Sequence, residues 1–253
     1  MILFISPHLD DVALSCGGFV ARLVRNGESV TIATLHTADA PTDRPLSESA
    51  RRLHAQWALG DQPYRYRREE DLQACAVLGA RAVHLGLDDA IYRYDAQGQP
   101  LYVENFIGGA VHPHDWEVHL PRVREALKLL IRQARTVYCP LALGRHVDHV
   151  IVRQAVEQLV DSAQPLIYYE DFPYAHRAES ADSSDLTAGM FPGTVALEEE
   201  EVALRLQAIA CYRSQLKELF GDEATMQRSV REYVARIGGE RYWQRFDAFR
   251  ADE

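Results

Sequence analysis

The sequence contains no long hydrophobic run and no long basic run. No uninterrupted apolar stretch approaches the roughly 20 residues that a membrane-spanning helix needs. The first residues, MILFISPHLDD, lack a basic segment and their apolar run ends at Pro7, so they do not have the pattern of a signal peptide. The formal net charge is −10, which argues against nucleic acid or an anionic membrane surface as the partner.

Cysteines are few, and the glycine motif of dinucleotide-binding proteins is absent. The four cysteines are widely spaced and form no CxxC pair, which is typical of reduced thiols in a cytoplasmic protein. No GxGxxG motif is present. Two acidic residues precede the isolated Gly17-Gly18 pair where a phosphate would have to lie, so we interpret this pair as a point of close helix–sheet packing.

The chain is long enough for one sizeable core. It has 253 residues, of which 47% are apolar and 25% are charged, as in an ordinary globular protein. We therefore expect a single domain over residues 1–253, with a core over about 1–170 and a C-terminal helical part over about 196–253.

Apolar runs alternate with helical patterns over the first two thirds of the chain. The patterns predict strands at Ile2–Ser6, Val30–His36, Arg81–Leu85, Thr136–Cys139 and Pro165–Tyr169. They predict helices at Val12–Arg25, Ser47–Leu59, Glu69–Leu78, Arg122–Ala134 and His146–Val160, and further helices over 198–220 and 223–236. This alternation indicates an α/β fold with a mostly parallel sheet covered on both faces. A site is then expected at the carboxyl ends of the strands.

Two short polar segments open helices directly after predicted strands. PHLDD at 7–11 follows the first strand, and HVDH at 146–149 follows the strand that ends at Cys139. Because the carboxyl ends of parallel strands meet at one edge of a sheet, the two segments can converge there.

These segments contain the ligand set of a zinc site. Catalytic zinc is held by three protein ligands, usually histidines and a carboxylate, with one position left for water. His8, Asp11 and His149 supply this set, whereas helix capping alone would not require the two histidines of 146–149. The same set suits ferrous iron, so Fe²⁺ is an alternative to Zn²⁺. The lack of an evident oxygenase signature favours hydrolysis.

The two segments resemble motifs of the LmbE-like, or PIG-L, family of zinc-dependent N-deacetylases, the N-acetylglucosaminyl-phosphatidylinositol de-N-acetylase family. That family carries a His-Pro-Asp-Asp-Glu motif after its first strand and a His-x-Asp-His motif later. RREE at 67–70 with LG at 78–79 is similar to the family's Arg-x-x-Glu helix, and LGLDD at 85–89 is similar to its next loop. The resemblance covers about residues 1–170.

The resemblance implies a Rossmann-like three-layer sandwich with C-terminal helices. It also implies that a zinc-bound water removes an N-acetyl group from an amino sugar, such as N-acetylglucosamine, or from its conjugate. By position, the zinc ligands would be His8, Asp11 and His149. Two positions depart from the family pattern, because Leu9 stands where proline is usual and Val12 stands where glutamate is usual.

The same resemblance assigns roles to five further residues. Asp10 would be the general base, and His146 would stabilise the oxyanion. Asp148 would lie beside His146 and keep its imidazole oriented and charged. Arg67 and Asp89 match positions that hold polar groups of the substrate.

Two long connections interrupt the regular pattern, over residues 86–120 and 171–195. Connections of this length usually form functional lids or disordered segments. The first contains a histidine- and aspartate-rich stretch at 112–119, which we interpret as a polar loop in preference to a second metal site. The segment 168–174 ends the last predicted strand, and we interpret it as a turn fixed by Pro173, with pocket lining as the alternative.

Other functions stay open at this point. One is a zinc amidase for another N-acyl or thiol conjugate, and another is a non-catalytic protein that binds a ligand or stores metal on the same fold. The presence of both Asp10 and His146 argues against the non-catalytic alternative. The expected partner is a small N-acetylated sugar or conjugate. The oligomeric state, a homo-oligomer included, is left open.

Overall fold

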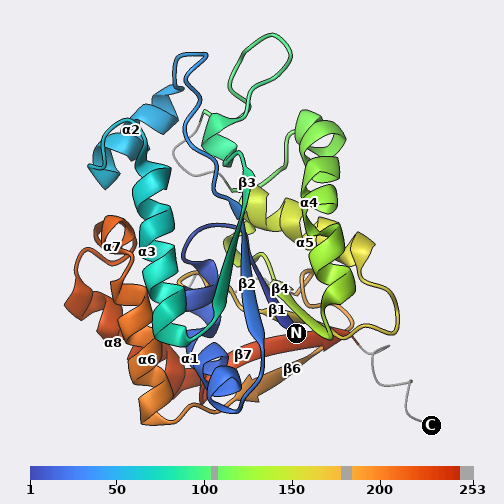
Figure 1. Cartoon of the computed structure of the whole chain (residues 1–253), viewed down its shortest axis with the longest axis vertical. Coiled ribbons are helices and arrows are strands. Elements are labelled where there is room, and N and C mark those ends of the chain that lie inside the picture. The colour runs from blue at the N-terminus through green and yellow to red at the C-terminus, as the bar shows by residue number, and fades with distance from the viewer. Residues whose placement is uncertain (104–107, 178–183, 246–253) are drawn as a thin grey trace.

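A mixed sheet forms the centre of the computed structural model, which describes residues 1–103, 108–177 and 184–245. Among these residues the sheet has seven strands in the order β3-β2-β1-β4-β5-β7-β6 (Figure 1). The strands are β1 Ile2–Ser6, β2 Val30–His36, β3 Arg81–Leu87, β4 Thr136–Pro140, β5 Leu166–Tyr169, β6 Met190–Val195 and β7 Glu240–Arg245. The pairs among β1 to β5 are parallel, whereas β7 pairs antiparallel with both β5 and β6.

Helices cover both faces of this sheet, as Figure 1 shows. They are α1 Asp11–Arg25, α2 Glu48–Trp57, α3 Pro63–Leu78, α4 Leu120–Gln133, α5 Val147–Leu159, α6 Glu199–Ala210, α7 Arg213–Phe220 and α8 Glu223–Ile237. Short helices add η1 Ala90–Tyr92, η2 Asp115–His119 and η3 Leu143–Arg145. α1 and α3 lie on one side of the sheet with α6 packed against them, and α4 and α5 lie on the other side. The predicted α/β class with a mostly parallel sheet is confirmed.

The first strand illustrates why the sheet is buried on both faces. All five residues of β1 are buried, and the four apolar ones alternate between two hydrophobic clusters. Leu3 and Ile5 join the cluster that includes α4 and α5 residues, while Ile2 and Phe4 join the cluster on the α1 and α3 side. A continuous apolar run is the pattern expected of such a strand.

The structure contains two strands that were not predicted, β6 within the connection 171–195 and β7 within the C-terminal part 196–253. The segment MFPGTV forms β6 at the edge of the sheet. Pro192 and Gly193 are unfavourable in most strands, so the sequence did not predict this one, but an edge strand tolerates proline. The helix predicted over 198–220 is divided between α6 and α7, and the division falls at Cys211 and Tyr212. Tyr212 is buried there and donates its hydroxyl to Asp71 Oδ1 at 2.7 Å.

A buried ion pair joins the C-terminal part to α1. Arg205 on α6 donates to the Leu14 carbonyl oxygen, and Glu240 on β7 accepts the backbone N–H groups of Gly18 and Phe19 at 2.9 and 3.0 Å. The two charged groups lie 3.3 Å apart, and both side chains are wholly buried. A Cβ at Gly18 would lie 2.6 Å from Leu197 and 3.1 Å from Glu240 Oε1, so this glycine allows close packing against the C-terminal part, which includes strand β7 of the sheet.

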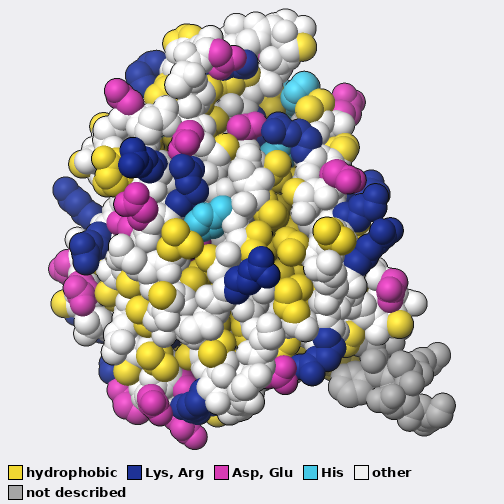
Figure 2. Space-filling view, viewed as in Figure 1, with side chains coloured by type: hydrophobic (Ala, Val, Ile, Leu, Met, Phe, Trp, Pro, Cys, Tyr) yellow, Lys and Arg dark blue, Asp and Glu magenta, His cyan; other side chains and the backbone are white. Residues whose placement is uncertain are grey.

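The order of the strands brings the polar segments together. β1 pairs with β4, and β4 pairs with β5, all in parallel. The turns that follow these three strands therefore open at the same edge of the sheet. Within the described ranges, no helix is both long and apolar enough to cross a membrane. On the face drawn in Figure 2, acidic and basic side chains are interspersed.

Candidate metal centre

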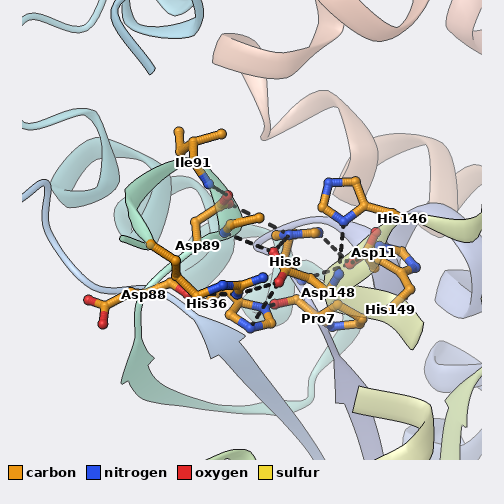
Figure 3. Close-up of polar contacts among 12 residues, drawn as sticks. Pro7, His8, Asp11, His36, Asp88, Asp89, Ile91, His146, Asp148 and His149 are labelled. Carbon is orange, nitrogen blue, oxygen red and sulfur yellow. Dashed lines mark hydrogen bonds and ion pairs between the residues drawn. The ribbon is translucent and has the colours of Figure 1, made fainter. Parts of the chain in front are cut away.

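The turn after β1 is folded by its own polar groups. The Ser6 hydroxyl donates to the His8 carbonyl oxygen at 2.7 Å, and the His8 backbone N–H donates to Asp11 Oδ2 at 2.7 Å. These bonds place the imidazole of His8 and the carboxylate of Asp11 beside His149, which comes from the first turn of α5 (Figure 3).

Three donor atoms meet at this point. Asp11 Oδ2 lies 3.4 Å from His8 Nδ1 and 3.4 Å from His149 Nε2. Ligands placed tetrahedrally at about 2.0–2.2 Å from a zinc ion would lie roughly 3.4 Å from one another. The two separations from Asp11 fit neighbouring ligands of a tetrahedral metal, and the nitrogen and carboxylate donors suit the predicted ion.

Each histidine has its other ring nitrogen held by a carboxylate. His8 Nε2 lies 3.0 Å from Asp148 Oδ2, and His149 Nδ1 lies 2.6 Å from Asp171 Oδ1. A proton on those nitrogens leaves His8 Nδ1 and His149 Nε2 as lone-pair donors, both directed toward Asp11. Carboxylates of this kind fix the tautomer of a metal-binding histidine and increase its basicity.

Asp148 therefore has a different contact from the expected one. Its carboxylate is directed at His8, at the Ala90 N–H and at the Arg93 guanidinium. Only its backbone N–H reaches His146, donating to Nδ1 at 3.2 Å. Because Nδ1 accepts this bond, a neutral His146 carries its proton on Nε2 and can donate it. Burial and the neighbouring His8 lower the pKa of His146 to about 3, which favours the neutral ring over the charged one we expected.

Two groupings of three donor atoms that could hold a metal occur among the described residues, and neither includes Asp11. The ring nitrogens of His8, His146 and His149 lie within 4.8 Å of one another, which places His146 beside the three predicted ligands. The second grouping joins His8 and Asp148 with His36. The ring nitrogens of His36 already contact the Pro7 carbonyl oxygen at 2.9 Å and His119 at 3.0 Å, so this imidazole is better explained as a packed, hydrogen-bonded neighbour.

The carboxylates around His8 and His149 favour the binding of a positively charged ion. Burial works against a charged imidazole, yet hydrogen bonds to Asp11 and Asp148 raise the pKa of His8 well above its usual value. For Asp11, burial opposes ionisation, but His149 and His8 lower its pKa below the usual range. A carboxylate that stays ionised beside histidines that attract positive charge is an environment suited to a divalent metal.

Asp10 is held in a strained backbone conformation. Its φ of 152° lies in a region that residues with a side chain rarely adopt. Asp11 uses its carboxylate on the two histidines, whereas Asp10 lines the pocket and lies 3.8 Å from Arg67 Nη2. Burial, and then the charge of Asp11, raises the pKa of Asp10 to about 8, which gives this carboxylate more affinity for a proton than its neighbour has.

A pocket opens above these residues. Its floor consists of His8, Asp10, Asp11, His146 and His149. Its walls come from five further parts of the chain, namely α2 with Leu53 and Trp57, Arg67 of α3, Asp89 after β3, the segment 172–174, and α7 with Gln215, Glu218 and Leu219. All eight residues predicted from the sequence lie in or beside this pocket.

The two predicted substrate contacts have protein partners in this structure. The Arg67 guanidinium lies 4.8 Å above the Trp57 ring and 5.0 Å above the Tyr64 ring, and it is almost fully buried. Asp89 accepts the Tyr64 hydroxyl and the Ile91 backbone N–H, the latter at 3.1 Å. Both residues still line the pocket, where their remaining polar atoms can meet a ligand.

The histidine- and aspartate-rich stretch 112–119 contributes to a buried network. Asp115 lies 2.9 Å from Arg93 Nη2 and accepts the Tyr102 hydroxyl at 2.7 Å. Since Arg93 also binds Asp148, this loop supports the carboxylate that orients His8. The stretch is not the polar loop that was predicted, because Asp115–His119 form the short helix η2 and both Asp115 and His119 are buried.

Sequence reasoning missed Asp171, Arg93, Trp57 and Glu218. Asp171 follows β5, and it could have been found by asking which acidic residue ends the strand beside β4. The other three lie on a loop or on helices outside the strand ends, where no motif singles them out.

Comparison with known proteins finds deacetylases. The chain is 35% identical over 189 residues to the 2'-N-acetylparomamine deacetylase of Streptomyces fradiae, and the match covers 71% of this chain but only 60% of that protein. It is 29% identical over 235 residues to the deacetylase of the same name from Niallia circulans, covering 88% and 83% of the two chains. A zinc-inhibited form of teicoplanin deacetylase has a similar structure, with a TM-score of 0.82, 28% identity and 96% of each chain covered.

The family match covers the floor of the pocket. Residues 3–160 match the PIG-L family, described as GlcNAc-PI de-N-acetylase. This segment contains both motif-bearing turns, whereas residues 172–174 and α7 lie beyond it. The match spans more than half of the chain, and the chain therefore belongs to the PIG-L family, as its motifs predicted.

Proposed function

We propose that this protein is a divalent-metal-dependent deacetylase that hydrolyses the N-acetyl group of an amino sugar or amino-sugar conjugate, with zinc as the metal. The observation that carries the proposal is the position of Asp11 Oδ2, at 3.4 Å from both histidine nitrogens, with each histidine oriented by its own carboxylate. The relatives support the reaction class, since they are named as deacetylases of N-acetylparomamine and of teicoplanin.

His8, Asp11 and His149 would hold the metal. When bound there, zinc would lower the pKa of water to about 7 and polarise the amide carbonyl. The carboxylate of Asp10 lies in the same pocket and next to Asp11 in sequence. With its raised pKa, Asp10 is suited to take a proton from the attacking water and then to pass it to the departing amine.

His146 would act on the amide oxygen. The backbone N–H of Asp148 occupies Nδ1, so the proton of the neutral ring lies on Nε2. Such a donor stabilises negative charge as it develops on the carbonyl oxygen during hydrolysis. The ring of His146 meets the ring of His8 edge to face at 4.8 Å between centroids, which keeps this donor beside the proposed ligands.

The test is acetate release from metal-reconstituted protein. The metal-free protein would be given one equivalent of Zn²⁺, Fe²⁺, Co²⁺ or Mn²⁺ and offered N-acetylglucosamine glycosides, mono-N-acetylated aminoglycosides and N-acetylated glycopeptide conjugates. Zinc would be titrated from below to above one equivalent, since a related deacetylase has a zinc-inhibited form. We expect acetate and amine in equal amounts from at least one amino sugar. An Asp11→Ala variant is the control.

The same experiment separates the alternatives. Release of a different acid or of a thiol conjugate would replace the deacetylase with another amidase. Metal binding at one equivalent without turnover of any substrate would support a non-catalytic protein on this fold. Turnover that is equal with and without metal would overturn the metal-dependent proposal.

A further inference from the structure

The outer wall of the pocket carries an acidic group that the proposed chemistry does not use. Gln215, Glu218 and Leu219 lie three and four positions apart on α7, so they share one face of that helix, and all three line the pocket. Opposite them, α2 contributes Leu53 and Trp57. The pocket mouth is therefore apolar at its sides, with a carboxylate in one wall.

The carboxylate of Glu218 is held in place by an indole. Trp57 Nε1 donates to Glu218 Oε2 at 2.8 Å. The ring of Trp57 is itself fixed, because the Arg67 guanidinium lies 4.8 Å above it and the His54 ring stacks on it at 6.0 Å. These contacts hold the Trp57 ring, and its Nε1–H in turn fixes the Glu218 carboxylate at the mouth of the pocket.

Glu218 keeps its charge uncompensated. No arginine or lysine among the described residues forms an ion pair with it. The nearest pocket cation, Arg67, is directed to Asp10 at 3.8 Å and to the Tyr64 hydroxyl at 3.3 Å. A divalent metal at the floor and Arg67 together would offset the charges of Asp10, Asp11 and Asp89. The negative charge of Glu218 then remains for the ligand.

Gln215 adds a second acceptor beside Glu218. Its side chain is 6% exposed, and its Nε2 donates to the Ser214 hydroxyl at 2.9 Å. The carbonyl oxygen Oε1 has no hydrogen-bond partner among the described residues. A carboxylate and an amide oxygen one helical turn apart match the several N–H donors of an ammonium group. An apolar chain in the same place would remove Glu218 from water and leave its charge with the Trp57 N–H as its only hydrogen-bond donor among the described residues, which disfavours lipid-like substituents.

We propose that Glu218 and Gln215 form a subsite for a second, free and protonated amino group of the substrate. The substrate class is then an N-acetylated amino sugar that retains at least one ammonium group, so the N-acetyl group is removed from a molecule that is already cationic. This inference rests on the proposed deacetylase function. It concerns the wall formed by α7, which lies outside the segment 3–160 that matches the family.

The experiment compares paired substrates that differ at one position. Each pair consists of an N-acetylglucosamine glycoside, with one or two rings, and the same compound with an amine in place of one hydroxyl. Glu218→Gln keeps the side-chain shape and an acceptor for Trp57 but removes the charge. We expect it to lower kcat/KM about 10-fold or more for the amine-bearing member, mainly through KM, and to change the hydroxyl member by less than about 2-fold.

Two controls make the outcome specific. Glu223→Gln removes the same charge from a residue that does not line the pocket, and it should leave both members of each pair unchanged. Glu218→Lys should lower kcat/KM for the amine-bearing member further than Glu218→Gln does. For the unaltered protein, the preference for the amine should decline as salt rises, because screening weakens an exposed charge pair.

The results separate the subsite from the deacetylase proposal. If Glu218→Gln lowers kcat/KM equally for both members, Glu218 is a structural support for Trp57. If it lowers kcat/KM for neither member, no ammonium subsite exists. If no compound is hydrolysed, the deacetylase proposal fails. The subsite is then judged by calorimetric binding of the deacetylated amine and hydroxyl glycosides. A preference for the amine that Glu218→Gln abolishes supports it, and equal affinities overturn it.

Discussion

The floor and the outer wall of the pocket are built in different ways. The floor comes from turns that follow β1 and β4, and its side chains are fixed by buried carboxylates such as Asp148 and Asp171. The wall comes from the surfaces of α2 and α7, where contacts such as Trp57 to Glu218 lie partly in solvent. The order of the strands therefore places the proposed metal ligands, whereas the residues of the wall depend on how two helices outside the sheet pack against each other.

The largest effect is expected from the three proposed ligands. His8→Ala, Asp11→Ala and His149→Ala should each lose the metal and nearly all activity, because a three-ligand site has no spare donor. Elemental analysis of the purified proteins measures this. Leu219→Ala, a change in the wall, is the matched control and should keep full metal content. Normal occupancy in all three floor variants would contradict the assignment.

Asp10→Asn should separate chemistry from metal binding within the floor. The amide keeps the size of the side chain and removes its basicity, so turnover should fall by roughly 100-fold to 10,000-fold while metal content stays normal. Metal analysis and kcat on the same preparation are the measurements. Loss of metal from this variant would show that Asp10, not Asp11 alone, serves as a ligand.

His146→Ala tests the proposed role of His146 as a hydrogen-bond donor to the amide oxygen. Removal of one such donor typically costs on the order of 100-fold to 1,000-fold in kcat. The effect should appear in kcat with little change in KM, since the interaction is stronger in the transition state than with bound substrate. If His146→Ala raises KM but leaves kcat unchanged, His146 binds the substrate and does not stabilise the transition state.

Asp171→Asn should have an intermediate effect on the metal. The carboxylate contacts His149 Nδ1 at 2.6 Å and also accepts the Leu143 N–H at 2.9 Å. Substitution of such an orienting group typically lowers metal affinity by about 10-fold to 100-fold. Competition with a chelator measures the affinity independently of activity. An affinity equal to that of the unaltered protein would leave Asp171 with only its role in holding the chain at Leu143.

The smallest effect concerns stability far from the pocket. Glu201 on α6 binds Arg22 and Arg25 of α1. Burial opposes its ionisation, but the hydrogen bonds from Arg22 lower its pKa below the usual value. Its contribution to stability is therefore present above about pH 4.3 and is lost as pH falls through the lower folded pKa. Glu201→Gln should lower Tm by a few degrees at pH 7, and the difference should shrink in acid.

Thermal unfolding at several pH values measures this last prediction. Glu125→Gln, which alters an exposed pair with Lys128, is the control and should cost little at any pH. A Glu201→Gln deficit that stays constant down to strong acid would mean that packing, and not the charge of Glu201, joins α6 to α1.

The floor could be predicted from the sequence because its residues are tied to strand ends. A buried apolar run followed at once by His8 and Asp11 fixes where those side chains lie, and the adjacency of parallel strands brings His149 to them. α3 was predicted too short, although Pro63 marks its true start because proline suits a first helical turn. The wall could not be predicted, because nothing local in the sequence specifies that Trp57 meets Glu218 across 161 positions.

The ion pair between Arg205 and Glu240 has a consequence for dividing or recombining this chain. Both charges are wholly buried and become partners only when α6, β7 and α1 are assembled. A fragment that stops at residue 160 would keep every proposed ligand but would lose the groups that hold the middle of α1. Grafts between relatives should therefore exchange α7 alone and leave Arg205 and Glu240 in place, so that the contacts among α1, α6 and β7 stay intact.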